Sequence, residues 1–139
     1  MFLDPGLKHE VVVPRLAAAL RTASDDAAIQ ISSVLGNLGT GAAPAIPAIL
    51  ERLGGPCSQD ARSVFIDSLG RIARDDPAAV PALVAALDDE KLRLAAIEAL
   101  GRARTAAKAA LPALRKVGRT GDEAVQHAAA VAIDRIEGK

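Results

Sequence analysis

Few residues of this 139-residue chain carry side chains suited to catalysis or metal binding. It has two histidines, His9 and His127, and a single cysteine, Cys57. His9 precedes Glu10, which gives one pair of metal-ligand types, but two isolated histidines do not make a metal site. No Ser-His-Asp set, phosphate-binding glycine loop or pair of inward carboxylates is present. We therefore expect a protein that is not an enzyme and that has no metal or cofactor.

Charged side chains suited to binding a partner occur in a more regular pattern. Asp67 precedes Arg71 by four residues, and Glu98 precedes Arg102 by the same interval. This spacing places both members of a pair on one face of a helix. Such pairs are also common on any solvated helix, so solubility is the better explanation for each residue taken alone. As a repeated set, they indicate an interaction surface.

Two sequence landmarks recur along the chain and define a repeat. The first landmark is a proline in an apolar stretch, and these prolines follow one another at intervals of 33, 34 and 31 residues. The second landmark comes about twenty residues after each proline, where a second helix-like stretch ends in an apolar residue followed by a small or polar one. A period of this length is typical of a solenoid, in which each repeat buries its face against its neighbours. The landmarks are Pro14, Pro47, Pro81 and Pro112, followed by Leu35-Gly36, Leu69-Gly70, Leu100-Gly101 and Ile133-Asp134.

The composition favours helices throughout. Half of the residues are hydrophobic but only 1% are aromatic, so the core must be built from Ala, Leu, Ile and Val. Ala and Leu have high helix propensity, and proline is tolerated in a first helical turn. We predict an all-α solenoid of four helix pairs, about eight helices in a right-handed superhelical stack. It forms one domain, 1–139, with repeats at approximately 8–38, 42–73, 76–104 and 106–137.

The charge balance limits the partners of the whole molecule. Lys and Arg number 17, as do Asp and Glu, which argues against non-specific attraction to nucleic acid or anionic lipid. One exception is the stretch 102–119, which holds six basic residues and no carboxylate. The single cysteine excludes an internal disulfide. No signal-peptide pattern and no apolar run long enough to span a bilayer is present, so we expect a soluble, cytoplasmic protein.

The third repeat carries a familiar consensus. It reads Ala79-Val80-Pro81-Ala82-Leu83 in its first helix and Leu-Arg-Leu-Ala-Ala-Ile-Glu-Ala-Leu-Gly-Arg over residues 92–102. This pattern resembles the HEAT-like repeat family, in the short form also found in bacterial bilin lyase subunits. The resemblance covers roughly residues 10–137. It is specific for the fold, but the matching positions are those that pack, so it does not identify one function.

The landmark position itself predicts how the repeats touch. Three of the four repeats have glycine there, although glycine inside a helix costs about 1 kcal/mol relative to alanine. Three such glycines in register, Gly36, Gly70 and Gly101, indicate that backbones crowd together at this position. The fourth repeat has Asp134 instead, which would not fit a crowded contact. We therefore expect the fourth repeat to be a C-terminal cap, with self-association through this end as the alternative.

The candidate partner surface is a row of residues on the second helices. We expect positions eight, four and three before the landmark and one after it to point away from the core. The family resemblance implies that the second helices line a concave face, and arginine mixed with aliphatic residues is favoured at interfaces. The residues predicted to bind a partner are Arg62, Ile66, Asp67, Arg71, Arg93, Ile97, Glu98, Arg102, Gln126 and Arg135.

We therefore interpret the chain as a non-catalytic interaction or scaffold module that binds a protein or peptide along this face. Two alternatives stay open. A bilin lyase-like subunit would bind a tetrapyrrole, and the basic stretch 102–119 would bind nucleic acid. The second is the weaker alternative, because the chain has almost no aromatic side chains to stack on bases. We expect no membrane partner, and end-to-end self-association is also open.

Overall fold

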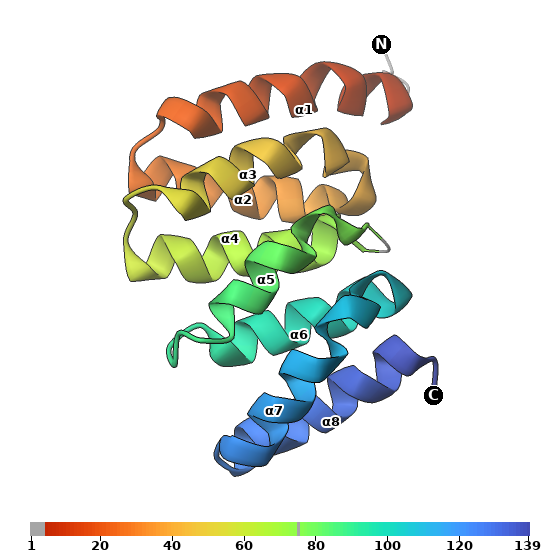
Figure 1. Ribbon diagram of the computed structural model, residues 1–139. Coiled ribbons are helices and arrows are strands. Elements are labelled where there is room, and N and C mark those ends of the chain that lie inside the picture. The colour runs from red at the N-terminus through yellow and green to blue at the C-terminus, as the bar shows by residue number, and fades with distance from the viewer. Residues whose placement is uncertain (1–4, 75) are drawn as a thin grey trace.

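The computed structural model describes residues 5–74 and 76–139, with side chains described from residue 11 onward. These residues form eight α-helices and three 3-10 helices, and no strand occurs among them, which confirms the predicted all-α solenoid of four helix pairs (Figure 1). The elements are α1 (Pro5–Thr22), α2 (Asp25–Leu38), η1 (Gly39–Ala45), α3 (Ile46–Gly54), α4 (Gln59–Ile72), η2 (Pro77–Ala79), α5 (Val80–Ala86), α6 (Arg93–Ala103), η3 (Arg104–Ala110), α7 (Leu111–Thr120) and α8 (Glu123–Glu137).

The helices form two layers. The second helices α2, α4, α6 and α8 pack on one another in chain order, and the first helices α1, α3, α5 and α7 cover them from one side (Figure 1). Aliphatic side chains from both layers make one continuous core, and Phe65 is its largest fully buried member. Each repeat therefore buries its apolar face against its own partner helix and against the neighbouring repeats.

Proline marks the start of three of the four first helices. Pro47, Pro81 and Pro112 each occupy one of the first two positions of a helix, where a missing N–H has no helical partner to lose. A 3-10 helix precedes each of these starts, so the chain changes geometry just before the proline. The expectation was wrong for Pro14, which lies inside α1 because that helix begins upstream at Pro5.

The three landmark glycines are the points at which second helices meet. A methyl group added to Gly70 would lie 2.7 Å from both Cα and Cβ of Ala99, closer than carbon atoms approach without moving something. Only a residue without a side chain lets α4 and α6 pack this closely, and this confirms the predicted backbone crowding. The equivalent distances are 3.2 Å from Gly36 to Ser68 Oγ and 3.3 Å from Gly101 to Cα and Cβ of Ala132.

The opposing residue is small as well. Each landmark glycine faces the residue two before the landmark of the next repeat, which is Ser68, Ala99 or Ala132. Val34 holds the same position in α2, where the described structure has no earlier second helix to meet it, and it is 48% exposed. The first helices are less closely spaced, since α3, α5 and α7 make little direct contact with one another. This difference in spacing favours a stack that curves toward the second helices.

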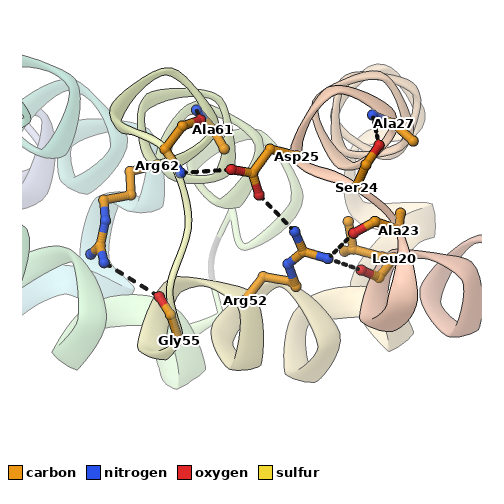
Figure 2. A network of polar contacts seen from close by, with 10 residues as sticks. Leu20, Ala23, Ser24, Asp25, Ala27, Arg52, Gly55, Ala61 and Arg62 are labelled. Atoms are coloured by element: carbon orange, nitrogen blue, oxygen red, sulfur yellow. Dashed lines mark hydrogen bonds and ion pairs between the residues drawn. The ribbon is translucent and has the colours of Figure 1, made fainter.

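Arg52 joins the first two repeats through a network of polar contacts (Figure 2). Its Nη1 donates to the carbonyl oxygens of Leu20 and Ala23 at 2.9 and 2.6 Å, near the end of α1. Its Nη2 donates to Asp25 Oδ1 at 3.0 Å, and the other oxygen of that carboxylate accepts from the backbone N–H of Ser58 at 2.9 Å. One arginine thus satisfies carbonyls that the end of α1 leaves free and fixes the loop before α4.

The described residues contain one helical segment apolar enough, by length and composition, to cross a membrane. It runs over residues 25–54, and an 18-residue stretch within it has a mean hydropathy of 1.2. In the structure it is divided among α2, η1 and α3, and α3 runs back in the direction opposite to α2 (Figure 1). Most of its apolar side chains pack in or against the core of the stack, and Val34 is an exposed exception.

We predict that Gly70→Ala destabilises the fold although alanine is the better helix former. Overpacking costs about 1–3 kcal/mol, and the gain in helix propensity of about 1 kcal/mol offsets only part of it. A net loss of up to about 2 kcal/mol in the free energy of unfolding should follow in urea titrations. Gly54→Ala is the matched control, since nothing lies within 4 Å of the added methyl group. A stabilised Gly70→Ala variant would contradict the crowded contact.

We also predict that Arg52→Met lowers the free energy of unfolding by about 2 kcal/mol, because hydrogen bonds to a charged group contribute about 1.5–3 kcal/mol. Methionine keeps most of the aliphatic stem in place. Arg21→Met is the control, since Arg21 forms an exposed ion pair with Glu51, and such pairs contribute less than about 1 kcal/mol. Thermal and urea unfolding would measure both losses. Equal losses would show that the Arg52 hydrogen bonds stabilise the fold no more than an exposed ion pair does.

Candidate functional site

Two of the residues predicted to face a partner are buried. Ile66 and Ile97, each four residues before a landmark, are 1% and 0% exposed, so the prediction that they point away from the core was wrong. The reason is that a second helix packs on its own first helix and also on the next repeat, which buries a wider part of its circumference than one stripe. Ala130 holds the same position in α8 and is exposed there.

The two arginines eight residues before the landmark are held by the fold. Arg93 Nε donates to the carbonyl oxygen of Leu87 at 2.8 Å, at the end of α5. Arg62 reaches the carbonyl oxygens of Leu53 and Gly55 at 3.4 and 3.3 Å, at the end of α3. Each guanidinium therefore satisfies the free carbonyls of the first helix in its own repeat. These guanidinium groups already form intramolecular hydrogen bonds in the absence of a partner.

A narrower strip of exposed and half-buried positions runs across α4, α6 and α8, and we call it the second-helix ridge. It consists of positions seven and three before the landmark and one after it. The charged pairs Asp67 with Arg71 and Glu98 with Arg102 lie on it, and extending their four-residue spacing upstream identifies Ser63 and Leu94, which the sequence interpretation missed. The ridge residues are Ser63, Asp67 and Arg71 in α4, Leu94, Glu98 and Arg102 in α6, and His127, Val131 and Arg135 in α8.

The ridge exposes apolar as well as charged groups. Leu94 is 43% exposed and Val131 is 38% exposed, on neighbouring helices. Gln126 lies next to the ridge, where its Nε2 donates to the carbonyl oxygen of Gly121 at 2.9 Å. Aliphatic residues between arginines and carboxylates make this surface suited to a protein partner, since interfaces combine apolar contact with charge-assisted hydrogen bonds.

Five arginines gather at one end of the ridge and line what we call the arginine groove. Its volume is about 450 Å³, and it lies at the C-terminal ends of α4, α6 and α8, which are on the same side of the stack (Figure 1). Gly70 and Gly101 also line it, so the close helix spacing that they permit brings the guanidinium groups together. The helix C-termini carry partial negative charge, which favours cations there. The arginines are Arg71, Arg74, Arg102, Arg104 and Arg135.

One carboxylate serves two of these arginines. Asp67 Oδ2 lies 3.3 Å from Arg71 Nε, and its Oδ1 lies 3.0 Å from Arg102 Nη1. Arg104 and Arg135 form no ion pair with any residue that the structure describes. Arg71, Arg102 and Arg135 belonged to the predicted partner surface, whereas Arg74 was missed because it lies beyond the helix alignment.

Arg104 has an unusual backbone conformation. Its φ is 52° and its ψ is −130°, and it is the one described residue other than glycine with a positive φ. In the first repeat the equivalent residue is Gly39, with φ 64° and ψ −139°. A side chain in such a conformation costs of order 1–3 kcal/mol. Arginine thus occupies a place where the same turn, elsewhere in this chain, uses glycine.

The basic stretch 102–119 is divided among α6, η3 and α7. Arg102 and Arg104 enter the arginine groove, whereas Arg115 on α7 pairs with Glu137 at 3.4 Å. Lys108 and Lys116 are exposed on η3 and α7. Because these groups lie on three different elements, the run of basic residues in the sequence does not by itself define a single binding track.

Groups suited to metal binding do not converge in the part of the chain whose side chains are described, where no three His, Cys, Asp or Glu residues come together. His9 and Glu10, the one such pair seen in the sequence, have side chains outside the described part. Cys57 is a half-buried thiol in the loop before α4.

The fold and its exposed second-helix ridge define an α-solenoid. The family of HEAT repeats matches residues 12–101, more than half of the chain, and the protein therefore belongs to the HEAT repeat family. A comparison with curated protein sequences finds no match. Among solved structures, the chain is similar to one in the complex of CpcE and CpcF of phycocyanin lyase from Nostoc sp. PCC7120. The TM-score is 0.66 at 26% identity, over 93% of this chain and 80% of that chain.

Proposed function

We propose that the protein is a non-catalytic interaction module that binds a protein or peptide partner along the second-helix ridge. The observation that carries this proposal is the set of charged side chains repeated on α4, α6 and α8, together with the exposed aliphatic side chains Leu94 on α6 and Val131 on α8. The solved structure that this chain resembles is a complex of two chains, which supports a protein partner in general terms. The HEAT repeat family supports the architecture without specifying an activity.

The spacing of the helices suits an extended peptide. Packed helices lie about 8–10 Å apart, so three second helices present a ridge about 16–20 Å across. An extended chain advances about 3.3 Å per residue and would cross them with about six residues. Leu94 and Val131 would contact apolar side chains of the partner, and Glu98 and Arg135 would contact its polar groups.

A second candidate function follows from the resemblance to phycocyanin lyase. In this role the protein would be a lyase-like subunit that binds a tetrapyrrole. A mostly apolar groove of about 500 Å³ lies between the second and third repeats, where α3 and α5 diverge. Leu53, Ile66 and Leu92 line it together with Arg62 and Asp89. A large apolar ligand needs such a space with a few polar anchors.

For the interaction module, we predict that Leu94→Ser and Val131→Ser weaken binding of a purified partner about tenfold each. Burying an aliphatic side chain contributes about 1.5–3 kcal/mol, and each factor of ten in affinity corresponds to about 1.4 kcal/mol. The partner would be identified by crosslinking to the full chain and then measured by calorimetry. Arg15→Gln on α1 is the control. All three variants should keep the free energy of unfolding within about 0.5 kcal/mol, and unchanged affinity in both ridge variants would refute the proposal.

For the lyase-like function, the expected result is a shift in the absorbance spectrum of a bilin when the protein is added. Ile66 and Leu53 line the groove, so Ala85→Glu, which places a charge on an exposed residue of the same groove, should abolish the shift. The unchanged spectrum of a bilin mixed with the wild-type protein would eliminate this candidate.

A further inference from the structure

We infer that the arginine groove recognises an acidic segment of the partner protein, in which carboxylates are followed by an apolar residue. This inference rests on the proposed interaction function and names the chemistry of the segment that the groove accepts. It is carried by charge, by backbone strain at Arg104 and by the neighbouring apolar surface.

The charge balance of the groove favours an anionic ligand. Five guanidinium groups line it, and Asp67 is the carboxylate that pairs with two of them, Arg71 and Arg102. Guanidinium groups bind carboxylates through two parallel hydrogen bonds, which gives both strength and orientation. Like charges so close together repel one another, and a ligand with several carboxylates would relieve that repulsion. The groove, with a volume of about 450 Å³, has room for more than one acidic side chain.

The backbone at Arg104 provides an independent argument. Glycine would hold its positive φ without strain, as Gly39 does in the first repeat. Packing does not explain the arginine, because Arg104 is exposed. Strain that is kept in a structure at an exposed residue is typical of functional sites. A guanidinium that binds a ligand accounts for the presence of arginine at this turn.

The surface beside the arginine groove determines which type of residue should follow the acidic residues in the bound segment. A second groove of about 370 Å³ shares Arg102 and Arg135 with the first, so the two are continuous. Ala128, Val131 and Ala132 on α8 line its apolar part, and Glu98 and His127 also line it. A peptide with acidic residues in the arginine groove would therefore place its next residue on an aliphatic surface.

The same region is poorly suited to a nucleic acid. Asp67 and Glu98 lie on the ridge beside the arginines, where they would repel a continuous line of phosphates. Single-stranded nucleic acid also needs aromatic side chains for stacking. The sequence has no Trp or Tyr, and Phe65 is buried in the core. A peptide avoids both conflicts, because its carboxylates can be spaced so that they do not face Asp67 and Glu98 and because it does not need stacking.

The test is fluorescence anisotropy with the full chain and a labelled peptide of about twelve residues built from Glu-Glu-Leu repeats, long enough to cross three helices. We expect Arg104→Gln and Arg104→Gly to raise its dissociation constant about tenfold, as loss of a charge-assisted hydrogen bond should. Arg119→Gln removes the same charge from α7 and should change it less than about twofold. Arg104→Gly should also raise the urea midpoint of unfolding, because it removes the strained side chain.

Further probes decide between ligand classes. A peptide with Gln in place of Glu should bind at least about tenfold more weakly. A single-stranded oligonucleotide of similar charge should bind more weakly than the Glu-Glu-Leu peptide. Tighter binding of the oligonucleotide, or equal affinity of the Glu peptide for the wild type and both Arg104 variants, would overturn the inference.

Failure of this inference differs from failure of the proposed function. A purified partner that loses affinity with Leu94→Ser but not with Arg104→Gln, and that the Glu-Glu-Leu peptide does not displace, would overturn the acidic-segment assignment alone. A partner unaffected by Leu94→Ser, Val131→Ser and Arg104→Gln would overturn both. Displacement of the partner by the Glu-Glu-Leu peptide, lost in Arg104→Gln, would support both.

Discussion

The close contact between second helices is the constraint on which the rest of the structure depends. Gly36, Gly70 and Gly101 each let the backbone of one second helix approach the next, and a methyl group on Gly70 would collide with Ala99. This contact spaces the second helices more tightly than the first helices and brings their C-terminal ends together. The arginine groove lies at those ends, with two of the glycines in its wall. One packing rule therefore shapes both the stack and its candidate site.

Arginines in this chain have two roles that their residue type does not distinguish. Arg52, Arg62 and Arg93 donate to carbonyl oxygens near the ends of first helices, where helices leave acceptors without partners. Arg104 and Arg135 instead line an exposed groove. The first group stabilises the solenoid, and the second is available to a ligand. Hydrogen-bond partners separate the two groups, because Arg52, Arg62 and Arg93 already donate to carbonyl oxygens at the ends of first helices.

A solenoid of this kind separates stability from recognition. Buried positions repeat from helix to helix and hold the stack together, so the same core can carry different exposed residues. The strain at Arg104 shows the two requirements in conflict at one residue. Glycine would suit the turn better, whereas arginine adds charge to the groove. The HEAT repeat architecture meets the requirement for stability, and the exposed residues of the ridge and the groove meet the requirement for recognition.

The sequence by itself determined the class of fold, since the proline and glycine landmarks repeat with the period of a helix pair and the three glycines indicated crowding. It also identified Arg71, Arg102 and Arg135 as a set, because residues at equal positions in a repeat align in space. Only the tertiary structure decided which sides of the second helices stay exposed. Ile66 and Ile97 became buried because the next repeat covers them, and Arg74 and Arg104 joined the groove because helix ends converge across repeats. The spacing of apolar residues along one helix does not show which of its residues the next repeat will cover.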